Sequence, residues 1–206
     1  YNPYEGKFGD EEGKLLLAYG LSTGTINTPL PVGYDYGDAP APYPTTQEVN
    51  GARHRLVPGV SLGNLKDAES NGVPSFRATG DDITHGDDED GVEFVEILRT
   101  GVTTPINVTA STNGFLNAWF DFNSDGDWND AGEQVFVDTP LSWGVNALSV
   151  STPNDASISR QFSETAAARF RFTTTSSHGS LTPTGSADDG EVEDYPLTIL
   201  KDRSEE

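Results

Sequence analysis

The sequence predicts an all-β protein, an antiparallel β-sandwich of the jelly-roll or immunoglobulin-like kind with long acidic loops. The first observation is a succession of short apolar or aromatic runs, several of which alternate with polar residues, as half-buried strands do. The second is that Gly, Pro, Asn and Asp separate these runs at regular intervals, where they favour turns. The third is that Ser163–Ala168, the one segment with local helical character, is too short for a stable helix.

We expect three parts along the 206 residues. Residues 1–33 form an N-terminal extension with one strand-like apolar run, Leu15–Leu21 (LLLAYGL), and a connector rich in Thr, Pro and Gly. Residues 34–200 form the sandwich domain, and residues 201–206 (KDRSEE) form a charged tail. Because a lone strand is not stable in water, the strand of the extension requires a partner.

Several segments of the sandwich domain are expected to be strands. They are Val92–Leu98, Val102–Ala110, Phe115–Phe122, Gln134–Asp138, Val145–Ser151, Ala168–Thr174 and Tyr195–Leu200. The aromatic segment FLNAWFDF is expected at the centre of a sheet, whereas the proline in VTTPINVTA suggests an edge strand, because proline cannot donate a ladder hydrogen bond. Alternation in ARFRFTT puts its Phe side chains on one face and its Arg side chains on the other.

Charge is the most pronounced feature of the composition: 33 Asp and Glu stand against 12 Lys and Arg, a formal net charge of −21. Such a chain repels phosphates, which argues against binding to nucleic acid or to an anionic membrane. No apolar run reaches the about 20 residues that span a bilayer, so we expect no membrane insertion. Bound divalent cations would relieve the repulsion among carboxylates; the alternative is an acidic surface that serves solubility.

The stretch Asp121–Glu133 (DFNSDGDWNDAGE) has the oxygen spacing of a calcium loop. Oxygen-bearing side chains stand at its first, third, fifth and seventh positions, and Gly126 stands at the sixth, where the chain turns sharply. The glutamate of an EF-hand belongs at the twelfth position, but here it comes one residue later and the flanks are strand-like, so we expect a calcium turn between strands. The expected ligands of Ca²⁺ are Asp121, Asn123, Asp125, Asp127 and Glu133. The alternative is a hydrogen-bonded turn without metal.

Two further acidic clusters, Gly80–Gly91 (GDDITHGDDEDG) and Ala187–Asp194 (ADDGEVED), each come shortly before an expected strand. Because loops at the same end of a sandwich can share one ion, we expect a second calcium site between them. Its expected ligands are Asp88, Asp90, Asp189 and Glu191. The alternative is that both clusters are solvated charge runs, which is the usual role of such sequences.

Six stretches of the sequence occur together in a known family. They are DYGDAP (Asp35–Pro40), GARH (Gly51–His54), GDDEDGV (Gly86–Val92), NAWFDFNSDGDWNDAGEQVF (Asn117–Phe136), ARFRF (Ala168–Phe172) and GEVEDYPLTI (Gly190–Ile199). Over about residues 34–200 the chain resembles the GEVED domain family of large secreted and surface proteins of bacteria. The resemblance implies an extracellular, calcium-stabilised β-sandwich module, often beside adhesion-type or cell-wall sorting segments, with no established catalytic activity.

We therefore expect a non-catalytic, calcium-binding structural or adhesive module of a secreted or cell-surface protein. The chain has no Cys and neither a G-x-S-x-G nor an H-E-x-x-H motif. Carboxylate pairs are abundant, but acids held by a cation are poor proton donors. The alternative is a carbohydrate-binding module of a secreted enzyme, in which Trp143, in an expected turn, would offer glycans an exposed aromatic platform.

The extension suggests a partner for the protein. Its segment Lys14–Tyr19 (KLLLAY) could add as a strand to the open edge of a neighbouring subunit. Repeated head to tail, this contact builds a filament rather than a closed ring. We expect the partner to be either the protein itself, in a head-to-tail homopolymer, or the neighbouring domains of a larger surface protein. The alternative is that the segment docks on its own domain.

Overall fold

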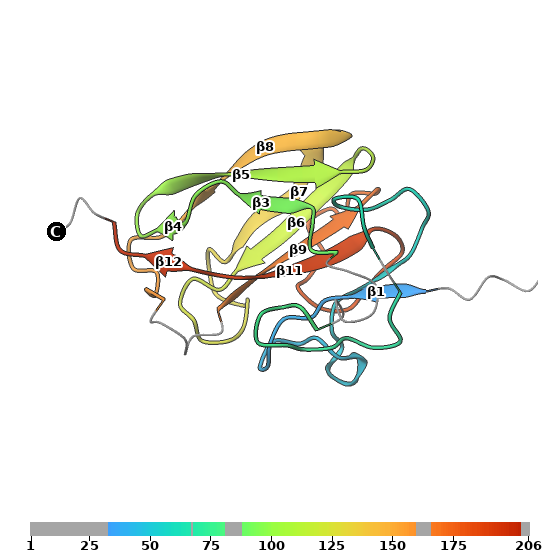
Figure 1. Ribbon diagram of the computed structural model, residues 1–206, viewed down its shortest axis with the longest axis horizontal. Coiled ribbons are helices and arrows are strands. Elements are labelled where there is room, and N and C mark those ends of the chain that lie inside the picture. Colours follow the sequence, from blue (N-terminus) through green and yellow to red (C-terminus); the bar gives the residue numbers. More distant parts are fainter. Residues whose placement is uncertain (1–32, 67, 81–87, 160–165, 203–206) are drawn as a thin grey trace, which may run out of the picture. The chain divides into compact units, whose positions relative to one another are not determined.

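The structure, a computed structural model, describes residues 33–66, 68–80, 88–159 and 166–202 (Figure 1). Contacts between Cα atoms divide the chain into two units, Tyr1–Pro31 and Val32–Glu206, and every described residue lies in the second unit. The strand expected in the N-terminal extension therefore lies outside the described residues.

The described residues form strands and one short 3₁₀ helix. The elements are β1 (Tyr34–Tyr36), the 3₁₀ helix η1 (Gln47–Val49), β2 (Arg53–Arg55), β3 (Val92–Phe94), β4 (Leu98–Arg99), β5 (Thr103–Ala110), β6 (Gly114–Phe120), β7 (Gln134–Leu141), β8 (Gly144–Ser151), β9 (Ala167–Thr173), β10 (Ser186–Ala187), β11 (Glu191–Pro196) and β12 (Ile199–Leu200). The all-β class predicted from the sequence is confirmed. In this part of the chain, no helix has the length and apolar character needed to cross a membrane.

Two antiparallel sheets dominate the described unit (Figure 1). One has four strands in the order β11-β9-β6-β7, and the other has three strands in the order β3-β5-β8. A small sheet joins β1 to β2 in antiparallel and β2 to β10 in parallel, and β4 pairs with β12 in parallel. The late strands β10 and β12 therefore pair with strands far earlier in the sequence, β2 and β4.

The two main sheets share one hydrophobic core. The three-stranded sheet contributes Ile106, Val108 and Val150, and the four-stranded sheet contributes Phe120 and Phe170, all of them fully buried. The rings of Phe120 and Phe170 meet edge to face, with centroids 5.5 Å apart. Burial of each such side chain contributes about 1.5–3 kcal/mol, which holds the sheets face to face in a sandwich-like arrangement.

The opposite face of the four-stranded sheet is also covered. The Phe side chains of ARFRF face the core and its Arg side chains lie on the other face, as predicted, but all of them are fully buried. Arg169 stands opposite Asp194 of β11 in the strand register and forms an ion pair with it. A second apolar cluster, with Tyr43, Trp119 and Trp128, packs on this face. The segment that carries β1 and β2 therefore forms an additional covering over the sandwich.

Each segment expected to be a strand contains one, with shifted ends. The segment Val92–Leu98 comprises β3 and the first residue of β4, and Tyr195–Leu200 comprises the end of β11 and all of β12. Three strands, β1, β2 and β10, were not expected. They have two or three residues each and no alternating apolar pattern, so local sequence carries no signal for them.

The expectation of an edge strand at VTTPINVTA is wrong. This segment forms β5, which lies between β3 and β8 in the centre of its sheet. Proline is tolerated there because β3 does not extend as far as Pro105. The last pair between β3 and β5 is Phe94 with Ile106, so Pro105 pairs only with Ser149 of β8.

Candidate metal centre

The candidate site lies at the start of β11, where the sequence reads GEVED (Gly190–Asp194). Gly190 has a φ of +99°, and a Cβ atom there would lie 1.7 Å from the carbonyl oxygen of Phe172 in β9. Only glycine permits both this backbone conformation and the close approach of the two strands. The turn at Gly190 thereby sets the position of Glu191, the first residue of β11.

Three buried carboxylates meet beside this turn. Asp35 comes from β1, Asp88 from the segment before β3, and Glu191 from β11. One carboxylate oxygen of each lies within 4.8 Å of those of the other two, and the residues are 2%, 6% and 0% exposed, respectively. Within the described ranges, no other group of three acidic, His or Cys side chains brings its ligand atoms this close together.

Hydrogen bonds fix two of these carboxylates and leave one oxygen without a partner. The backbone N–H of Val192 donates to Asp35 Oδ2 over 2.6 Å, and the N–H of Leu62 donates to Glu191 Oε2 over 2.5 Å. The other oxygen of Glu191, Oε1, is buried and accepts no hydrogen bond. A buried carboxylate oxygen without a partner costs at least about 1–3 kcal/mol, so this position favours a ligand that binds oxygen.

Burial and neighbouring acids raise the pKa of two glutamates of β11. Burial raises the pKa of Glu191 well above its usual value, and the charges of neighbouring acids, Asp35 first, raise it further. Burial also raises the pKa of Glu193 to about 8, and the charges of Asp90 and Asp88 act in the same direction against its hydrogen bonds. The protein alone thus holds too little positive charge at this point for all of these carboxylates to ionise freely.

One lysine lies near enough to interact with the cluster. Burial lowers the pKa of Lys66, and attraction to Glu191 and Asp35 opposes this effect. The ammonium group of Lys66 donates hydrogen bonds to the carbonyl oxygens of Val57 and Val60. Lys66 therefore reduces the negative potential while its donors are directed to backbone.

The geometry suits a hard divalent cation. Ligand oxygens of Ca²⁺ lie about 2.3–2.6 Å from the ion, so two of them cannot be more than about 5.2 Å apart. The mutual separation of up to 4.8 Å in the cluster satisfies this limit. Three carboxylates supply part of the six to eight oxygens that Ca²⁺ prefers, and backbone carbonyls or water can supply the rest.

The structure brings together two of the four ligands expected for the second site. Asp88 and Glu191 belong to the cluster, whereas Asp90 and Asp189 fasten neighbouring turns. Asp90 Oδ1 accepts hydrogen bonds from the N–H groups of Asn64 and Leu65, at 2.8 and 3.3 Å. The carboxylate of Asp189 binds the N–H and the hydroxyl of Thr174. The two acidic clusters meet through the carboxylates of Asp88 and Glu191 and through the hydrogen bond from the Gly91 N–H to Glu193 Oε1.

Sequence reasoning missed Asp35 as a site residue. Asp35 stands alone among aromatic residues in YDYGDAP rather than in an acidic run. The available signal was an isolated acid within a short segment flanked by tyrosines, which is unfavourable in a buried strand unless the acid has a partner.

The expected calcium loop, residues 121–133, is folded by its own side chains. Asp121 accepts hydrogen bonds from the N–H groups of Ser124 and Gly126, at 2.5 and 3.0 Å. Asn123, Asp125 and Asp127 each accept one from the N–H two residues further on. Gly126 has a φ of +92°, as the sharp turn at the sixth position requires. The amide of Asn123 also donates to Asp125 Oδ2 and Asp130 Oδ2, at 3.1 and 2.6 Å, so side chains of the loop bond one another as well as its backbone.

Glu133 closes the loop and resembles Glu191. Its Oε2 accepts a hydrogen bond from the N–H of Asp130, and its Oε1 is buried without a hydrogen-bond partner. Burial raises the pKa of Glu133 to about 7, and the charges of Asp121, Asp130 and Asp125 contribute. A hollow of about 310 Å³ beside Glu133 is lined in part by Asn123 and Asp155. This end of the loop therefore has both a hollow large enough for an ion and a carboxylate oxygen without a hydrogen-bond partner.

Two buried arginines support the site from the other face of the sheet. Asp194 receives two hydrogen bonds of 2.7 Å from the guanidinium of Arg169, which also lies 4.6 Å from the centre of the Trp128 ring. Arg171 Nε donates to His54 Nε2 over 2.9 Å, and the His54 Nδ1–H donates to the carbonyl of Asp189. Together with the hydrogen bond of 2.8 Å from the Ala39 N–H to Asp194 Oδ2, these contacts join the DYGDAP, GARH, ARFRF and GEVED stretches at one junction.

Comparison with known proteins bears on this junction. The family model of the GEVED domain matches residues 115–198, from β6 to the link between β11 and β12. Over this segment the chain matches the GEVED domain family, which confirms the resemblance seen in the sequence. No curated protein and no solved structure matches the chain. The matched segment includes Glu191, whereas Asp35 and Asp88 lie before it.

Proposed function

We propose that the protein is a non-catalytic calcium-binding module of an extracellular or cell-surface protein, with a structural or adhesive role. The observation that carries this proposal is the buried cluster of Asp35, Asp88 and Glu191, in which Glu191 Oε1 has no hydrogen-bond partner. A cation in the cluster would tie together β1, the segment before β3 and β11, which are far apart in the sequence. Its role would be to stabilise the fold.

Calcium fits the site and the setting best. The donors are hard oxygens, and extracellular modules bind Ca²⁺ with Kd values of about 10⁻⁴–10⁻³ M, near its concentration outside cells. We assign a second ion to the loop of residues 121–133, supported by its oxygen spacing and by the partnerless Oε1 of Glu133.

The same proposal covers the finer fold and the partners. The sandwich-like pair of antiparallel sheets supports a jelly-roll or immunoglobulin-like sandwich with the acidic segments as its calcium-binding loops. The edge strands β7, β8 and β3 support addition of a strand from the N-terminal extension of another copy, or contact with a neighbouring domain.

Calorimetric titration of the full chain with Ca²⁺ tests the metal assignment. We expect binding with Kd values of about 10⁻⁴–10⁻³ M. Glu191→Gln should remove the heat of one site, Asp127→Asn should weaken the other, and Glu96→Gln, at an exposed acid, should change neither. Absence of binding at 10 mM Ca²⁺, or equal binding by wild type and both site variants, would refute the assignment.

A carbohydrate-binding module is the second candidate, and Trp143 favours it. Trp143 lies in the turn between β7 and β8 and is 76% exposed. The backbone N–H of Trp143 donates to Asn113 Oδ1 over 2.9 Å, which fixes the turn while the ring is exposed to solvent. A glycan pull-down with wild type and Trp143→Ala tests this candidate. Retention that is lost in the variant supports it, and failure of the wild type to retain any glycan contradicts it.

A further inference from the structure

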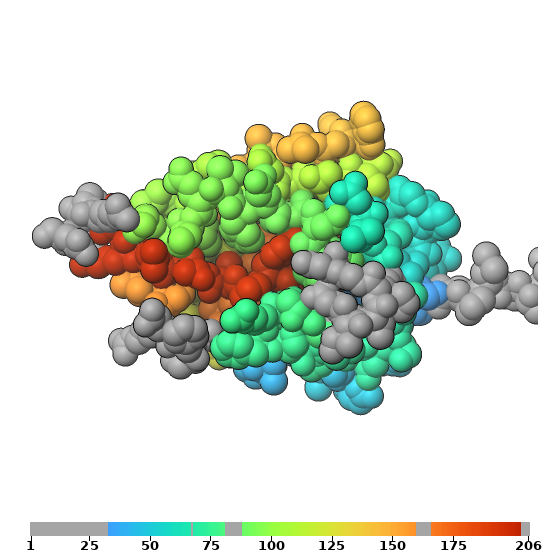
Figure 2. Space-filling view, in the orientation of Figure 1, coloured from blue at the N-terminus to red at the C-terminus, as the bar shows by residue number. Residues whose placement is uncertain are grey.

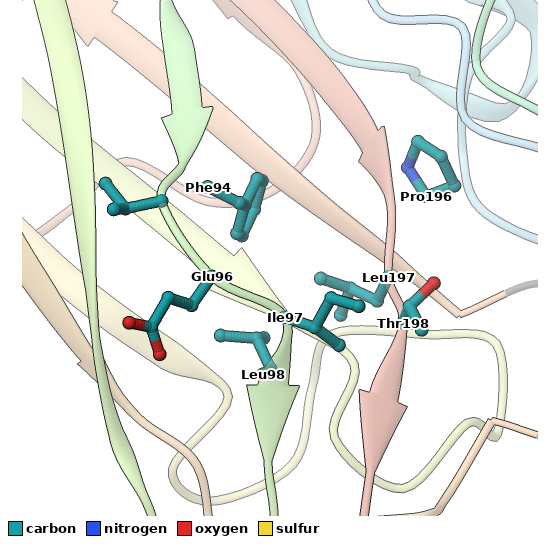
Figure 3. A pocket seen from close by; sticks show the side chains of 8 residues that line it. Phe94, Glu96, Ile97, Leu98, Pro196, Leu197 and Thr198 are labelled. Atoms are coloured by element: carbon teal, nitrogen blue, oxygen red, sulfur yellow. The ribbon is translucent and has the colours of Figure 1, made fainter.

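An apolar slot separates two neighbouring segments at the edges of the main sheets (Figure 3). Its volume is about 300 Å³, and its lining comes from residues 94–98, between β3 and β4, and from residues 196–198, between β11 and β12. Figure 3 shows Phe94, Ile97 and Leu197 directed into the space between the two segments, whereas the carboxylate of Glu96 points away. In Figure 2 the two segments reach the surface in view, β3–β4 in green above β11–β12 in red.

The slot exists because the strands on its two sides are joined only at their ends. At one end, the N–H groups of Gly91 and Val92 donate to the side chains of Glu193 and Tyr195, at 2.9 and 3.1 Å. At the other end, β4 pairs with β12. Between these joints, residues 95–97 form no backbone–backbone hydrogen bond with another described residue. The slot thus has a short stretch of unpaired backbone on one wall and an apolar lining on which aliphatic side chains can pack.

The exposure of its side chains indicates that the slot accepts an apolar partner. Val95 and Ile97 are 48% and 53% exposed, and they flank Leu98 and Leu197, which are almost fully buried. This patch is therefore continuous with the core of the molecule. An occupant with aliphatic side chains would extend that core outward.

We propose that this slot binds the apolar run Leu15–Leu21 from the N-terminal extension of a second copy of the chain. The assignment rests on the proposed self-association and names its acceptor. The run LLLAYGL supplies adjacent aliphatic side chains outside the described unit, and the slot is lined by aliphatic ones. Lys14 precedes the run, and Glu96 lines the slot with its carboxylate directed away from the cavity.

The position of the slot favours a second copy over the same chain. In Figure 1, β1, which follows the extension in the sequence, lies toward one end of the described unit, and β4 and β12 lie toward the other. The extension is joined to the described unit just before β1, so its binding to the slot of another copy would be a head-to-tail contact. Contacts of this head-to-tail kind propagate into a filament.

The first experiment measures the mass of the full chain in calcium by light scattering over a range of concentrations. Wild type should form oligomers that grow with concentration. Ile97→Lys places a charge in the slot and should weaken assembly at least about tenfold, as should joint replacement of Leu15, Leu16 and Leu17 by Ser. Val49→Lys, at an aliphatic side chain of similar 57% exposure in η1, should assemble like wild type. Melting curves establish that each variant is folded.

The second experiment mixes the slot variant with the triple Ser variant. The mixture retains one intact extension and one intact slot, so it should form dimers and nothing longer. Monomeric mixtures, or a wild type that stays monomeric at all concentrations, would overturn the proposal. If the triple Ser variant loses assembly and Ile97→Lys keeps it, the extension binds elsewhere, which overturns the slot assignment alone. Neither outcome alters the calcium titration, so the metal proposal is judged separately.

Discussion

At the scale of single residues, substitutions at two glycines can separate two causes of lost stability, a strained backbone conformation and a steric clash. Gly190 and Gly132 have nearly equal φ values of +99° and +98°, but only at Gly190 would a Cβ collide with a neighbouring strand. We predict that Gly190→Ala lowers the free energy of unfolding by well over 1 kcal/mol, because strain and collision add. Gly132→Ala should be destabilising by about 1 kcal/mol, from strain alone.

Urea unfolding of the two glycine variants measures both values. The difference between them isolates the approach of β11 to β9 at the carboxylate cluster. Equal losses of stability would show that this approach is not as tight as the structure indicates.

His54 is a buried residue whose protonation state follows from its two contacts. It accepts a hydrogen bond from Arg171 Nε at Nε2 and donates one from Nδ1 to the carbonyl of Asp189. Burial, and then the charges of Arg171 and Arg169, hold the pKa of His54 well below its usual value. The folded protein therefore keeps His54 neutral where the unfolded chain binds a proton.

This difference predicts the pH dependence of stability. The contribution of His54 is fully present above its unfolded pKa of about 6.5 and is lost as the pH falls, by about 1.4 kcal/mol per pH unit. In His54→Gln the amide can accept from Arg171 and donate to Asp189 without titrating. Unfolding curves between pH 7.5 and 5 should therefore fall less steeply for the variant than for wild type, and parallel curves would contradict the assignment.

At the scale of elements, the ladder between β9 and β11 combines an apolar face with a charged one. On one face Phe170 and Phe172 enter the core, and on the other Arg169 pairs with Asp194, both fully buried. The bidentate geometry and the carbonyls of Pro44 and Pro183 satisfy the guanidinium of Arg169. A charged pair can be buried here because its polar atoms have partners.

Removal of one member of this pair should be severe. Arg169→Met leaves Asp194 buried without its counter-charge, and we predict a loss of about 3–5 kcal/mol of stability in urea unfolding. The double variant Arg169→Met, Asp194→Asn removes the unpaired charge as well. It should be more stable than Arg169→Met alone, and a double variant that is less stable would show that the pair acts mainly through packing.

At the scale of the whole molecule, the net charge of −21 disfavours the compact state through repulsion among carboxylates, which bound cations would relieve. A ligand that binds only the folded state at 100 times its Kd adds about 2.7 kcal/mol. For a domain of this size, each kcal/mol shifts the Tm by about 2–4 °C. We therefore predict that saturating Ca²⁺ raises the Tm by about 5–11 °C over the chelated protein.

The matched measurement for this effect is the melt of Glu191→Gln. In that variant the rise in Tm with Ca²⁺ should shrink, while Glu96→Gln should keep it. An identical melt of the wild-type protein in Ca²⁺ and after metal removal by EDTA would contradict a calcium-stabilised fold.

The sequence predicted the longer strands, but not the position of β5 in its sheet or the site residue Asp35. The longer strands were found because period-two alternation is a local property, and the face assignment of ARFRF followed from it. The edge assignment of β5 failed because the effect of Pro105 depends on where the neighbouring strand β3 ends. Likewise, Asp88 and Glu191 were proposed as ligands because they stand in acidic runs, whereas Asp35 stands in none.

The sequence by itself determined that the chain is rich in short strands, strongly acidic, and equipped with oxygen-bearing side chains at calcium-loop spacing. These are properties of composition and of neighbours along the chain. Only the tertiary structure decided which carboxylates converge, because Asp35, Asp88 and Glu191 are joined by pairing and packing between distant segments. The tertiary structure also decided that the Arg face of β9 is buried. The strands that cover it, β1 and β2, have three residues each, which is too short for a sequence pattern to predict them.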